Sequence, residues 1–538
     1  MDLILINGII ETMDNSNPRV EAVAVKNGKI TEIGSTDKIL KLKKEDTKVI
    51  DLEGKLLIPG FNDSHMHLLN YGVSLQLADL VNCTSIDNMI DTVKDFINQN
   101  NITSGKWIRG MRWNHNLFLE KRLPDRYDLD KISVEHPVIL SRVCGHVIAV
   151  NSKALELAGI NKNTPQVEGG LFDLDENDNP TGIFREKAIQ LIINHIPKPG
   201  IEEIKNYIRI AADKLIKYGI TSVQSDDFPV FSVDFELILE AYKQLINEGD
   251  LSLKIYEQCN FKDLTSLKDF IDRGYYTGHG DDFFKIGPLK LLADGSLGAR
   301  TAYLSEPYSD DPSTYGIPVF TQEELDQLVS VASEANLQLA IHAIGDKAMD
   351  MAMESIKKVH KPNNYDRHSI IHCQITNRQL LDKFKSLNLL ALIQPLFVAT
   401  DLHFAEERVG KNRVNTSYNW KGMLDRNIIM ACSSDCPVES PNVLHGIYAA
   451  VTRKDLKGYP ESGWLPEQKL TVAETVYCYT MGAAYVSFDE NKKGSITPGK
   501  YADMVVLSDN IFDLDPDKIK DVDVLMTFVN GKLVYSKQ

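Results

Sequence analysis

Two hydrophobic patterns alternate through the middle of the chain. Short aliphatic runs bounded by turn residues are typical of buried strands, and apolar residues three or four positions apart indicate amphipathic helices. Helical patterns separate several of the runs, for example at 204–217, 323–335 and 377–384. The strands predicted after the first cover 220–224, 253–258, 284–292, 338–342, 369–372, 389–393 and 428–433. Strands that alternate with helices favour a parallel sheet with crossover helices.

An apolar run at 56–58 leads into a further strand, which ends near His65 and makes eight in total. Eight strand–helix units predict an α/β protein with a TIM (β/α)8 barrel, whose active site lies at the carboxyl ends of the strands. About 150 residues separate this strand from the next one, more than a barrel connection needs. We therefore expect an inserted subdomain at about 75–200, after barrel strand 1.

The insertion contains a predicted strand at 136–142 and a turn-rich stretch at 169–182. Acidic residues in the second segment superficially suggest a calcium loop. The glycine and the closing glutamate that such a loop requires are missing, so a β-hairpin is predicted instead.

Both ends of the chain carry short predicted strands separated by turns, with Asn27-Gly28 as a hairpin signal. These strands cover 3–6, 22–26 and 29–33 at one end and 504–507, 524–529 and 532–535 at the other. Neither end has enough strands to bury a core by itself. We expect a small β-sandwich domain built from both termini, 1–57 and 488–538, beside a barrel of 58–487. Two independent β appendages are the alternative.

The composition excludes several classes of partner and site. Lys and Arg total 59 against 75 Asp and Glu, so the formal net charge of -16 disfavours nucleic acid and anionic membranes as partners. The seven cysteines are scattered without a Cys-x-x-Cys motif, which indicates neither a zinc ribbon nor a disulfide framework. No basic leader precedes the first apolar run and no window reaches transmembrane length, so a cytoplasmic protein is expected.

A His-x-His pair, His65 and His67, stands shortly after the first barrel strand begins. Residues two apart on a strand point to one face, so both imidazoles can reach a single metal ion. Four more polar residues lie at or near the ends of later predicted strands: Lys290, His342, His372 and Asp435. Singly, each has an ordinary explanation as a salt-bridged lysine, a buried histidine or a helix N-cap. Together, at one face of a barrel, they predict a metal centre.

Three longer phrases make the chain resemble the amidohydrolase superfamily of metal-dependent hydrolases. They are Asp-Gly-Ser-Leu-Gly-Ala-Arg-Thr-Ala at 294–302, His-Ala-Ile-Gly-Asp at 342–346 and Ser-Asp-Cys-Pro-Val at 434–438. Within the superfamily the chain is similar to amidohydrolase family 3, the group containing N-substituted formamide deformylase-like proteins. The resemblance covers nearly the whole length, including the tail at 494–503.

The resemblance implies a set of metal ligands. They are His65, His67 and Asp435 for the more buried metal, His342 and His372 for a second, and Lys290 as a carbamate bridging both. Zinc suits imidazole and carboxylate ligands, while iron and manganese stay open, at one or two metals per chain. In the implied reaction a metal-activated hydroxide attacks a carbonyl carbon, and Asp435 acts as general base and then general acid toward the leaving nitrogen.

Other residues are weaker candidates. A substrate-binding role is predicted for Trp113, His146, Arg185, Asp294 and Arg300, each of which a structural role explains as well. Ile371 stands where similar proteins often carry an acid before the histidine, so a contact that supports His372 is expected to be missing.

These features predict an amidohydrolase that cleaves a carbon–nitrogen bond in a small amide, formamide or related substrate. Two alternatives stay open: a mononuclear deaminase of the same superfamily, and a catalytically silent barrel used for binding. The number of metals per chain separates the three. A homodimer is a candidate state because many such barrels dimerise, although no interface is apparent from the sequence.

Overall fold

The computed structural model describes residues 1–231 and 233–537. The chain forms two compact units. The first combines Met1–Tyr71 and Ile204–Val230 with the chain from Asp234 onward, and the second consists mainly of Gly72–Glu203. Each unit is described by itself below.

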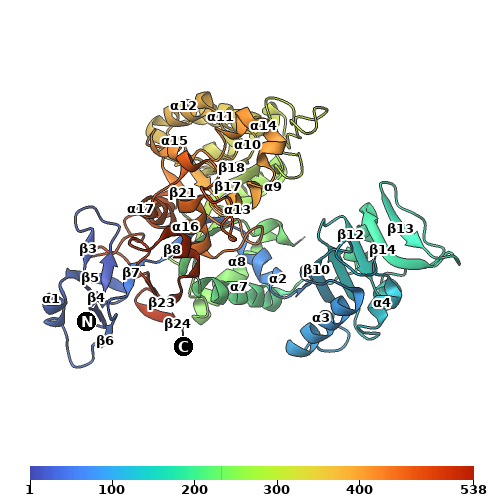
Figure 1. Ribbon diagram of the computed structural model, residues 1–538, viewed down its shortest axis with the longest axis horizontal. Coiled ribbons are helices and arrows are strands. Elements are labelled where there is room, and N and C mark those ends of the chain that lie inside the picture. The colour runs from blue at the N-terminus through green and yellow to red at the C-terminus, as the bar shows by residue number, and fades with distance from the viewer. Residues whose placement is uncertain (232, 538) are drawn as a thin grey trace. The chain divides into compact units, whose positions relative to one another are not determined.

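An eight-stranded parallel sheet forms the centre of the first unit (Figure 1). Its strands, in chain order, are β8 (Phe61–Met66), β15 (Ile220–Ser225), β16 (Lys254–Asn260), β17 (Phe284–Leu292), β18 (Leu339–Ala343), β19 (Ser369–His372), β20 (Leu390–Ile393) and β21 (Met430–Cys432). Each strand pairs in parallel with the next in that order. The prediction of a TIM-like barrel is confirmed, and β17 and β19 have the predicted bounds.

Loop and side-chain hydrogen bonds join the last barrel strand to the first. The hydroxyl of Ser64 on β8 donates to the carbonyl of Cys432 at the end of β21, at 2.9 Å. Just beyond, the backbone N–H of Asp435 donates to the carbonyl of His65, also at 2.9 Å. These bonds bring the loop after β21 beside the end of β8.

Helices follow most of the barrel strands and bury one apolar face. The predicted helices correspond to α7 (Ile201–Ile216), α10 (Gln322–Glu334) and α12 (Arg378–Ser386). The first begins three residues before its predicted start, because Glu202 and Glu203 form a polar first turn ahead of the apolar pattern. Asn377 caps α12, with its side chain accepting from the backbone of Leu380.

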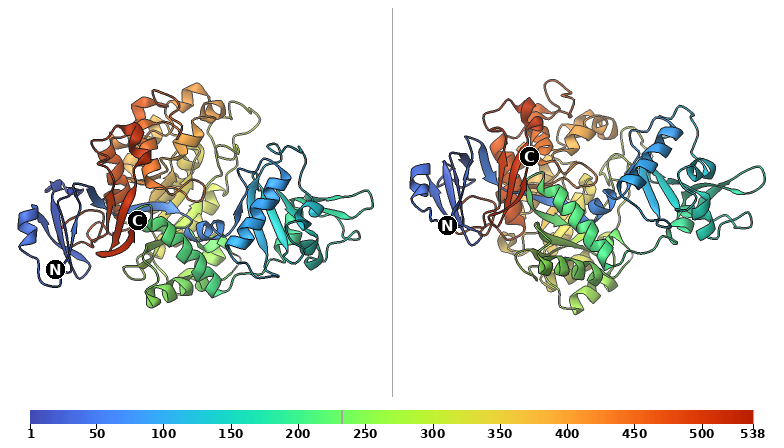
Figure 2. Two further views of the ribbon diagram at one scale, coloured as in Figure 1. Left: turned by 60° about the horizontal axis from the view of Figure 1, so that its bottom comes forward. Right: turned by 90° about the horizontal axis from the view of Figure 1, so that it is seen from below.

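Strands from both ends of the chain lie side by side in the first unit (Figure 2, blue and red). One sheet contains β1 (Leu3–Ile6), β4 (Ala22–Lys26), β5 (Lys29–Gly34) and β6 (Lys48–Asp51). The other contains β2 (Ile9–Glu11), β3 (Arg19–Val20), β7 (Leu56–Pro59), β22 (Met504–Leu507), β23 (Val524–Val529) and β24 (Lys532–Ser536). Side chains from both sheets, such as Leu5, Val23, Leu57, Met504 and Phe528, share one hydrophobic core. The predicted domain limits stay predictions.

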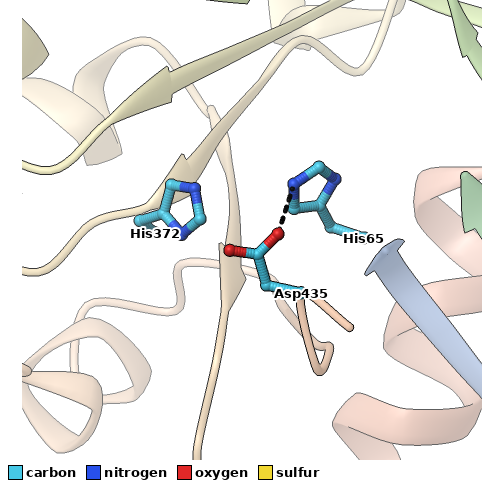
Figure 3. A group of neighbouring side chains, drawn as sticks. All are labelled: His65, His372 and Asp435. Atoms are coloured by element: carbon cyan, nitrogen blue, oxygen red, sulfur yellow. Dashed lines mark ion pairs between the residues drawn. The ribbon is translucent and has the colours of Figure 1, made fainter. Parts of the chain in front are cut away.

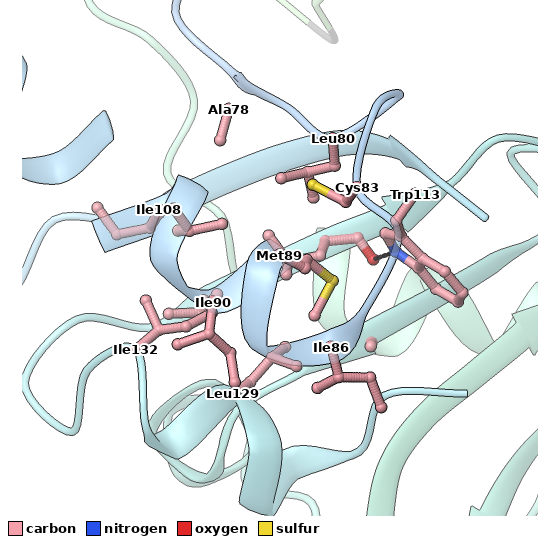
Figure 4. Packing of buried hydrophobic residues seen from close by; sticks show 14 of the residues in the cluster. Ala78, Leu80, Cys83, Ile86, Met89, Ile90, Ile108, Trp113, Leu129 and Ile132 are labelled. Carbon is pink, nitrogen blue, oxygen red and sulfur yellow. Dashed lines mark hydrogen bonds between the residues drawn. The ribbon is translucent and has the colours of Figure 1, made fainter. Parts of the chain in front are cut away.

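The second unit has a six-stranded mixed sheet. Its strands are β9 (Ala78–Asp79), β10 (Ile108–Trp113), β11 (Val138–Arg142), β12 (Val147–Val150), β13 (Gly170–Leu174) and β14 (Pro180–Glu186). The predicted hairpin is confirmed, because β13 and β14 pair antiparallel. Helix α3 (Ile86–Gln99) buries Ile86, Met89, Ile90 and Val93 in a core that includes Trp113 (Figure 4).

Across the described residues, no helix is both long and apolar enough to cross a membrane. All seven cysteines carry free thiols, and only Cys144 is exposed.

Candidate metal centre

The predicted ligands gather at the carboxyl end of the barrel sheet. Three of them, His65, His372 and Asp435, each offer a ligand atom within 4.8 Å of the other two, and all three side chains are buried. His65 and His372 lie on either side of the Asp435 carboxylate (Figure 3). They come from β8, β19 and the loop after β21, so the barrel brings together residues that are far apart in the sequence.

The Asp435 carboxylate contacts the His-x-His pair through one oxygen. Asp435 Oδ1 lies 3.2 Å from Nε2 of His65 and 3.2 Å from Nε2 of His67. The two rings stand edge to face with centroids 5.3 Å apart. His65 and His67 therefore point to the same side of the chain, as the spacing predicted.

Lys290 and His342 complete the predicted set. The Lys290 Nζ lies 3.1 Å from Nε2 of His65 inside the barrel, with the residue 2% exposed. The His342 ring is 4.3 Å from the His372 ring, centroid to centroid. Its Nε2 lies 3.1 Å from the carbonyl oxygen of Gly295 and 3.3 Å from Asp294 Oδ1. Nδ1 is therefore the His342 nitrogen left for a ligand.

The donor set fits a divalent metal. Two ligands on a tetrahedral zinc ion lie about 3.3 Å apart, given Zn–N and Zn–O bonds of about 2.0–2.1 Å. The observed 3.2 Å separations of Asp435 Oδ1 from the two imidazole nitrogens agree with this value. Imidazole and carboxylate donors suit zinc and other borderline cations.

The charges of the site also call for a cation next to Asp435. Burial would raise the pKa of Asp435, but the His65 and His67 rings beside it hold the pKa well below its ordinary value. Burial and the Lys290 charge lower the pKa of His65 to about 4. Burial lowers the pKa of His67 as well, but its bond with Asp435 and the nearby carboxylate charges raise it to about 9. Without a metal, a proton on His67 supplies the positive charge that this carboxylate needs.

The Lys290 ammonium has no carboxylate within ion-pair distance among the described residues. Burial lowers its pKa to about 8, against the attraction of the Asp226 and Asp435 charges. A lysine buried in this way is costly as an ammonium ion.

The backbone is unusual at two of the ligands. His372, with φ of 80°, and Asp435, with φ of 58°, occupy the left-handed region that non-glycine residues rarely adopt. Such conformations persist when the surroundings hold them, and they concentrate at functional sites. At Asp435 the restraint comes from the preceding residue, because Ser434 donates from its N–H and its hydroxyl to the buried carboxylate of Asp63, at 3.1 and 2.5 Å.

Four residues that contact the proposed ligands or the Asp435 loop were missed from the sequence: Asp63, Asp226, Gln258 and Gln394. Asp63 has the same spacing signal as the histidines, two positions before His65 on the same strand face. The two glutamines lie at the ends of predicted strands, where the rule applied to the histidines would have found them. Gln394 also corrects the expectation at Ile371, because it supplies the contact with His372, at 2.8 Å from Nδ1.

Two weaker candidates of the first unit hold the loop after β17. The Asp294 carboxylate is buried and accepts from the backbone N–H groups of Tyr303, Ile344 and Gly345 at 2.8–3.0 Å. Arg300 pairs with Asp310, with Nη2 to Oδ2 at 2.6 Å. Their role in substrate binding stays a prediction.

The other three candidates belong to the second unit. Trp113 is fully buried in its core, and its indole N–H donates to the carbonyl of Leu140 at 2.9 Å (Figure 4). His146 lies 3.0 Å from Glu186, and Arg185 pairs with Asp173 at 2.6 Å. A substrate-binding role for these residues stays a prediction too.

Known proteins match this chain over almost its full length. YtcJ of Bacillus subtilis is 33% identical over 539 residues, covering 100% of both chains. The N-substituted formamide deformylase of Arthrobacter pascens is 26% identical, covering 100% of this chain and 98% of its own. The crystal structure of an uncharacterized metal-dependent hydrolase from Pyrococcus furiosus superposes with a TM-score of 0.78 at 29% identity, covering 96% of this chain and 100% of its own.

The family model described as the amidohydrolase family matches residues 48–535. The predicted resemblance is thereby confirmed, and so is the predicted enzyme class, a hydrolase acting on carbon–nitrogen bonds. The metal-dependent hydrolase among the structural relatives agrees with a metal centre at the His65, His372 and Asp435 group. This chain belongs to the amidohydrolase family.

Proposed function

We propose that this enzyme hydrolyses the carbon–nitrogen bond of a small amide, formamide or related substrate at a centre of one or two divalent metal ions, with zinc the first candidate. One observation supports the proposal most: Asp435 Oδ1 lies 3.2 Å from two imidazole nitrogens in a buried site. A carboxylate and imidazoles that converge on one point provide the donors of a hydrolytic metal site.

The residues that would hold the metals are those at the strand ends. They are His65, His67 and Asp435 on one side, His372 and His342 on the other, and Lys290 between them. A bound divalent metal would supply Lewis acidity, which favours the deprotonation of water and polarises a carbonyl group. His342 would bind through Nδ1, because Nε2 already lies at the Gly295 carbonyl.

Asp435 would move the proton. Both histidines contact its Oδ1, which leaves Oδ2 to accept a proton from the attacking water. The same oxygen would return that proton to the leaving nitrogen, since an amide anion is a poor leaving group. Two hydrogen bonds keep the carboxylate in place: one from the Asp435 N–H to the His65 carbonyl, and one from the Ser434 hydroxyl to the Asp63 carboxylate.

Lys290 would act as a carbamate. The ammonium group would first lose a proton. The neutral amine would then attack carbon dioxide and release a second proton, so that an anion replaces a buried ammonium ion that has no carboxylate partner among the described residues. Its Nζ lies 3.1 Å from the Nε2 of His65, a nitrogen that also faces Asp435. An anion at this position would add a ligand next to His65.

The test begins with metal content per chain, measured by elemental analysis on protein purified without chelator, with His65→Ala as the control variant. Two equivalents, largely lost in the variant, support the proposal. A panel of N-formyl and N-acyl amines then follows, because a formamide deformylase is among the relatives. One equivalent together with deamination of a ring amidine would favour the deaminase. No metal after incubation with zinc and bicarbonate would overturn the proposal and leave a binding barrel.

A further inference from the structure

Two buried glutamines contact two of the proposed ligand histidines from neighbouring parts of the barrel. Gln258 lies on β16 and Gln394 directly follows β20. Gln258 Oε1 is 2.6 Å from Nδ1 of His65, and Gln394 Oε1 is 2.8 Å from Nδ1 of His372. Both glutamines are almost fully buried, at 0% and 3% exposure, so their hydrogen bonds are made inside the protein.

The amide of Gln258 can have only one orientation. Its other end, Nε2, lies 3.1 Å from the backbone carbonyl of Ser64. A carbonyl only accepts hydrogen bonds, so the nitrogen must face Ser64 and the oxygen must face His65. Nδ1 of His65 must then be the donor, which leaves Nε2 of the neutral ring with its lone pair.

A longer series of bonds orients Gln394. The Ser433 hydroxyl donates to the carbonyl of Ile393 at 3.1 Å, so its oxygen accepts from Gln394 Nε2 at 2.8 Å. Gln394 Nε2 also lies 3.4 Å from the Leu392 carbonyl. With the Ser433 hydroxyl donating to Ile393, this bond places the nitrogen on the Ser433 side, and the Leu392 carbonyl, which only accepts, favours the same orientation. Oε1 therefore accepts from Nδ1 of His372.

We propose, on the basis of the proposed function, that Gln258 and Gln394 are positioning residues that hold His65 and His372 in the tautomer and orientation that present Nε2 to the metal. Partners of this kind fix the tautomer and the ring orientation of ligand histidines. An amide does what a carboxylate cannot, because it accepts from the histidine and donates to a second backbone or hydroxyl oxygen. Each amide thereby links a ligand histidine to the end of another strand, and it adds no charge to the site.

The test replaces each amide with the similarly shaped Met. Gln258→Met and Gln394→Met are expected to weaken zinc binding by roughly 10–100-fold, measured by competition with a chromophoric chelator. Gln224→Met is the matched control, because Gln224 is a fully buried glutamine of β15 whose Nε2 donates to the Ala483 carbonyl at 3.0 Å and which bonds no histidine. Thermal unfolding of the metal-free proteins measures the purely structural cost for all three variants.

Glutamate variants separate positioning from packing. In Gln394→Glu the new oxygen faces the Ser433 hydroxyl, which can rotate and donate to it, so zinc affinity is expected to stay within a few-fold of wild type. In Gln258→Glu the new oxygen faces the Ser64 carbonyl, which cannot donate, so affinity is expected to fall as in Gln258→Met. The visible spectrum of the cobalt-loaded protein is expected to change in Gln258→Met and Gln394→Met and to stay unchanged in Gln224→Met.

Each outcome decides the proposal. Wild-type zinc affinity and an unchanged cobalt spectrum in both histidine-facing Met variants would overturn the positioning role while leaving the proposed function intact. Losses equal to that of Gln224→Met would overturn it also. Wild-type protein that binds no zinc would overturn the proposed function and the positioning role together. If the Met variants do not fold, the contrast between Gln394→Glu and Gln258→Glu decides.

Discussion

Lys254 and Lys290 are buried on adjacent barrel strands but at opposite ends of them. Lys254 begins β16, and its Nζ donates to Asp503 Oδ2 at 2.5 Å and to Asn530 Oδ1 at 2.7 Å. Lys290 lies near the carboxyl end of β17, and its only hydrogen-bond partner in the described chain is Nε2 of His65. The first lysine is satisfied by the protein, whereas the second has a charge that the protein does not neutralise.

The surroundings of the two lysines extend this difference. At the amino end of the barrel, Lys285 bonds Asp489 at 2.7 Å and Lys493 lies 3.4 Å from the same carboxylate. The Lys254–Asp503 and Lys285–Asp489 pairs join barrel strands to the C-terminal segment of the chain. At the carboxyl end, acceptors converge on one point instead. Buried charge is therefore structural where its partners are complete and a sign of function where they are not.

The largest expected effect is on catalysis at the carboxyl end. Asp435→Asn keeps the size of the side chain but removes the oxygen that would carry the proton. Hydrolysis of the best substrate from the N-formyl and N-acyl panel is expected to fall by roughly 10²–10⁴-fold. The measurement is kcat at saturating substrate and matched metal content. Activity within threefold of wild type would rule out Asp435 as the proton carrier.

At the amino end the large effect is expected on folding. Lys254→Met leaves the Asp503 carboxylate buried without its cation, which is expected to lower the free energy of unfolding by roughly 3–5 kcal/mol. Denaturant unfolding measures this loss, and metal content per folded chain should not change. Adding Asp503→Leu to Lys254→Met should recover much of the stability, since a buried pair can be replaced by apolar side chains. No recovery would contradict the account of Lys254 as a paired structural charge.

Lys290→Met is expected to lower metal binding and to leave folding almost unchanged, the reverse of Lys254→Met. The free energy of unfolding of the metal-free variant should fall by no more than about 1 kcal/mol. Removing the Lys290 charge leaves no buried carboxylate without its ion-pair partner. Its zinc content should fall below that of wild type, since a carbamate can no longer form. Elemental analysis and denaturant unfolding of the same preparation measure both. A strongly destabilised variant with full metal content would show that Lys290 supports the fold rather than the metal site.

The smallest expected effect is a pH dependence at the amino end. Burial raises the pKa of Asp489, but the charges of Lys493 and Lys285 outweigh it and lower the pKa below the ordinary value of 3.8. A lowered carboxyl pKa stabilises the fold above that value, and the contribution disappears as the pH falls through the folded-state pKa. The stability difference between wild type and Asp489→Asn should therefore shrink below about pH 4. A constant difference between pH 7 and pH 3 would show that the ion pairs contribute nothing.

Local patterns in the sequence were enough for the eight barrel strands and for the six proposed ligands. The aliphatic run at 284–292 and the short run at 369–372 gave strands with the bounds of β17 and β19. Asn27-Gly28 gave the turn between β4 and β5. The six proposed ligands were found because strand ends meet at one face of a barrel, whatever the details of packing.

Other features depend on which strands become neighbours. Strand β6 pairs in parallel with β1, a pairing that no turn between them specifies. Gln258 is 193 residues from His65, and no local pattern gives the register that places its amide at Nδ1. The same is true of Asp63, which reaches Ser434 across 371 residues.

The sequence by itself determined the barrel strands, the hairpin turn at Asn27-Gly28 and the types of residue offered at the barrel face, because hydrophobic patterning and turn chemistry act over a few residues. The tertiary structure alone decided which buried lysine is paired, which ring nitrogen each histidine presents and what holds the Asp435 loop. Those choices depend on hydrogen-bond geometry between side chains that come together only when the barrel closes.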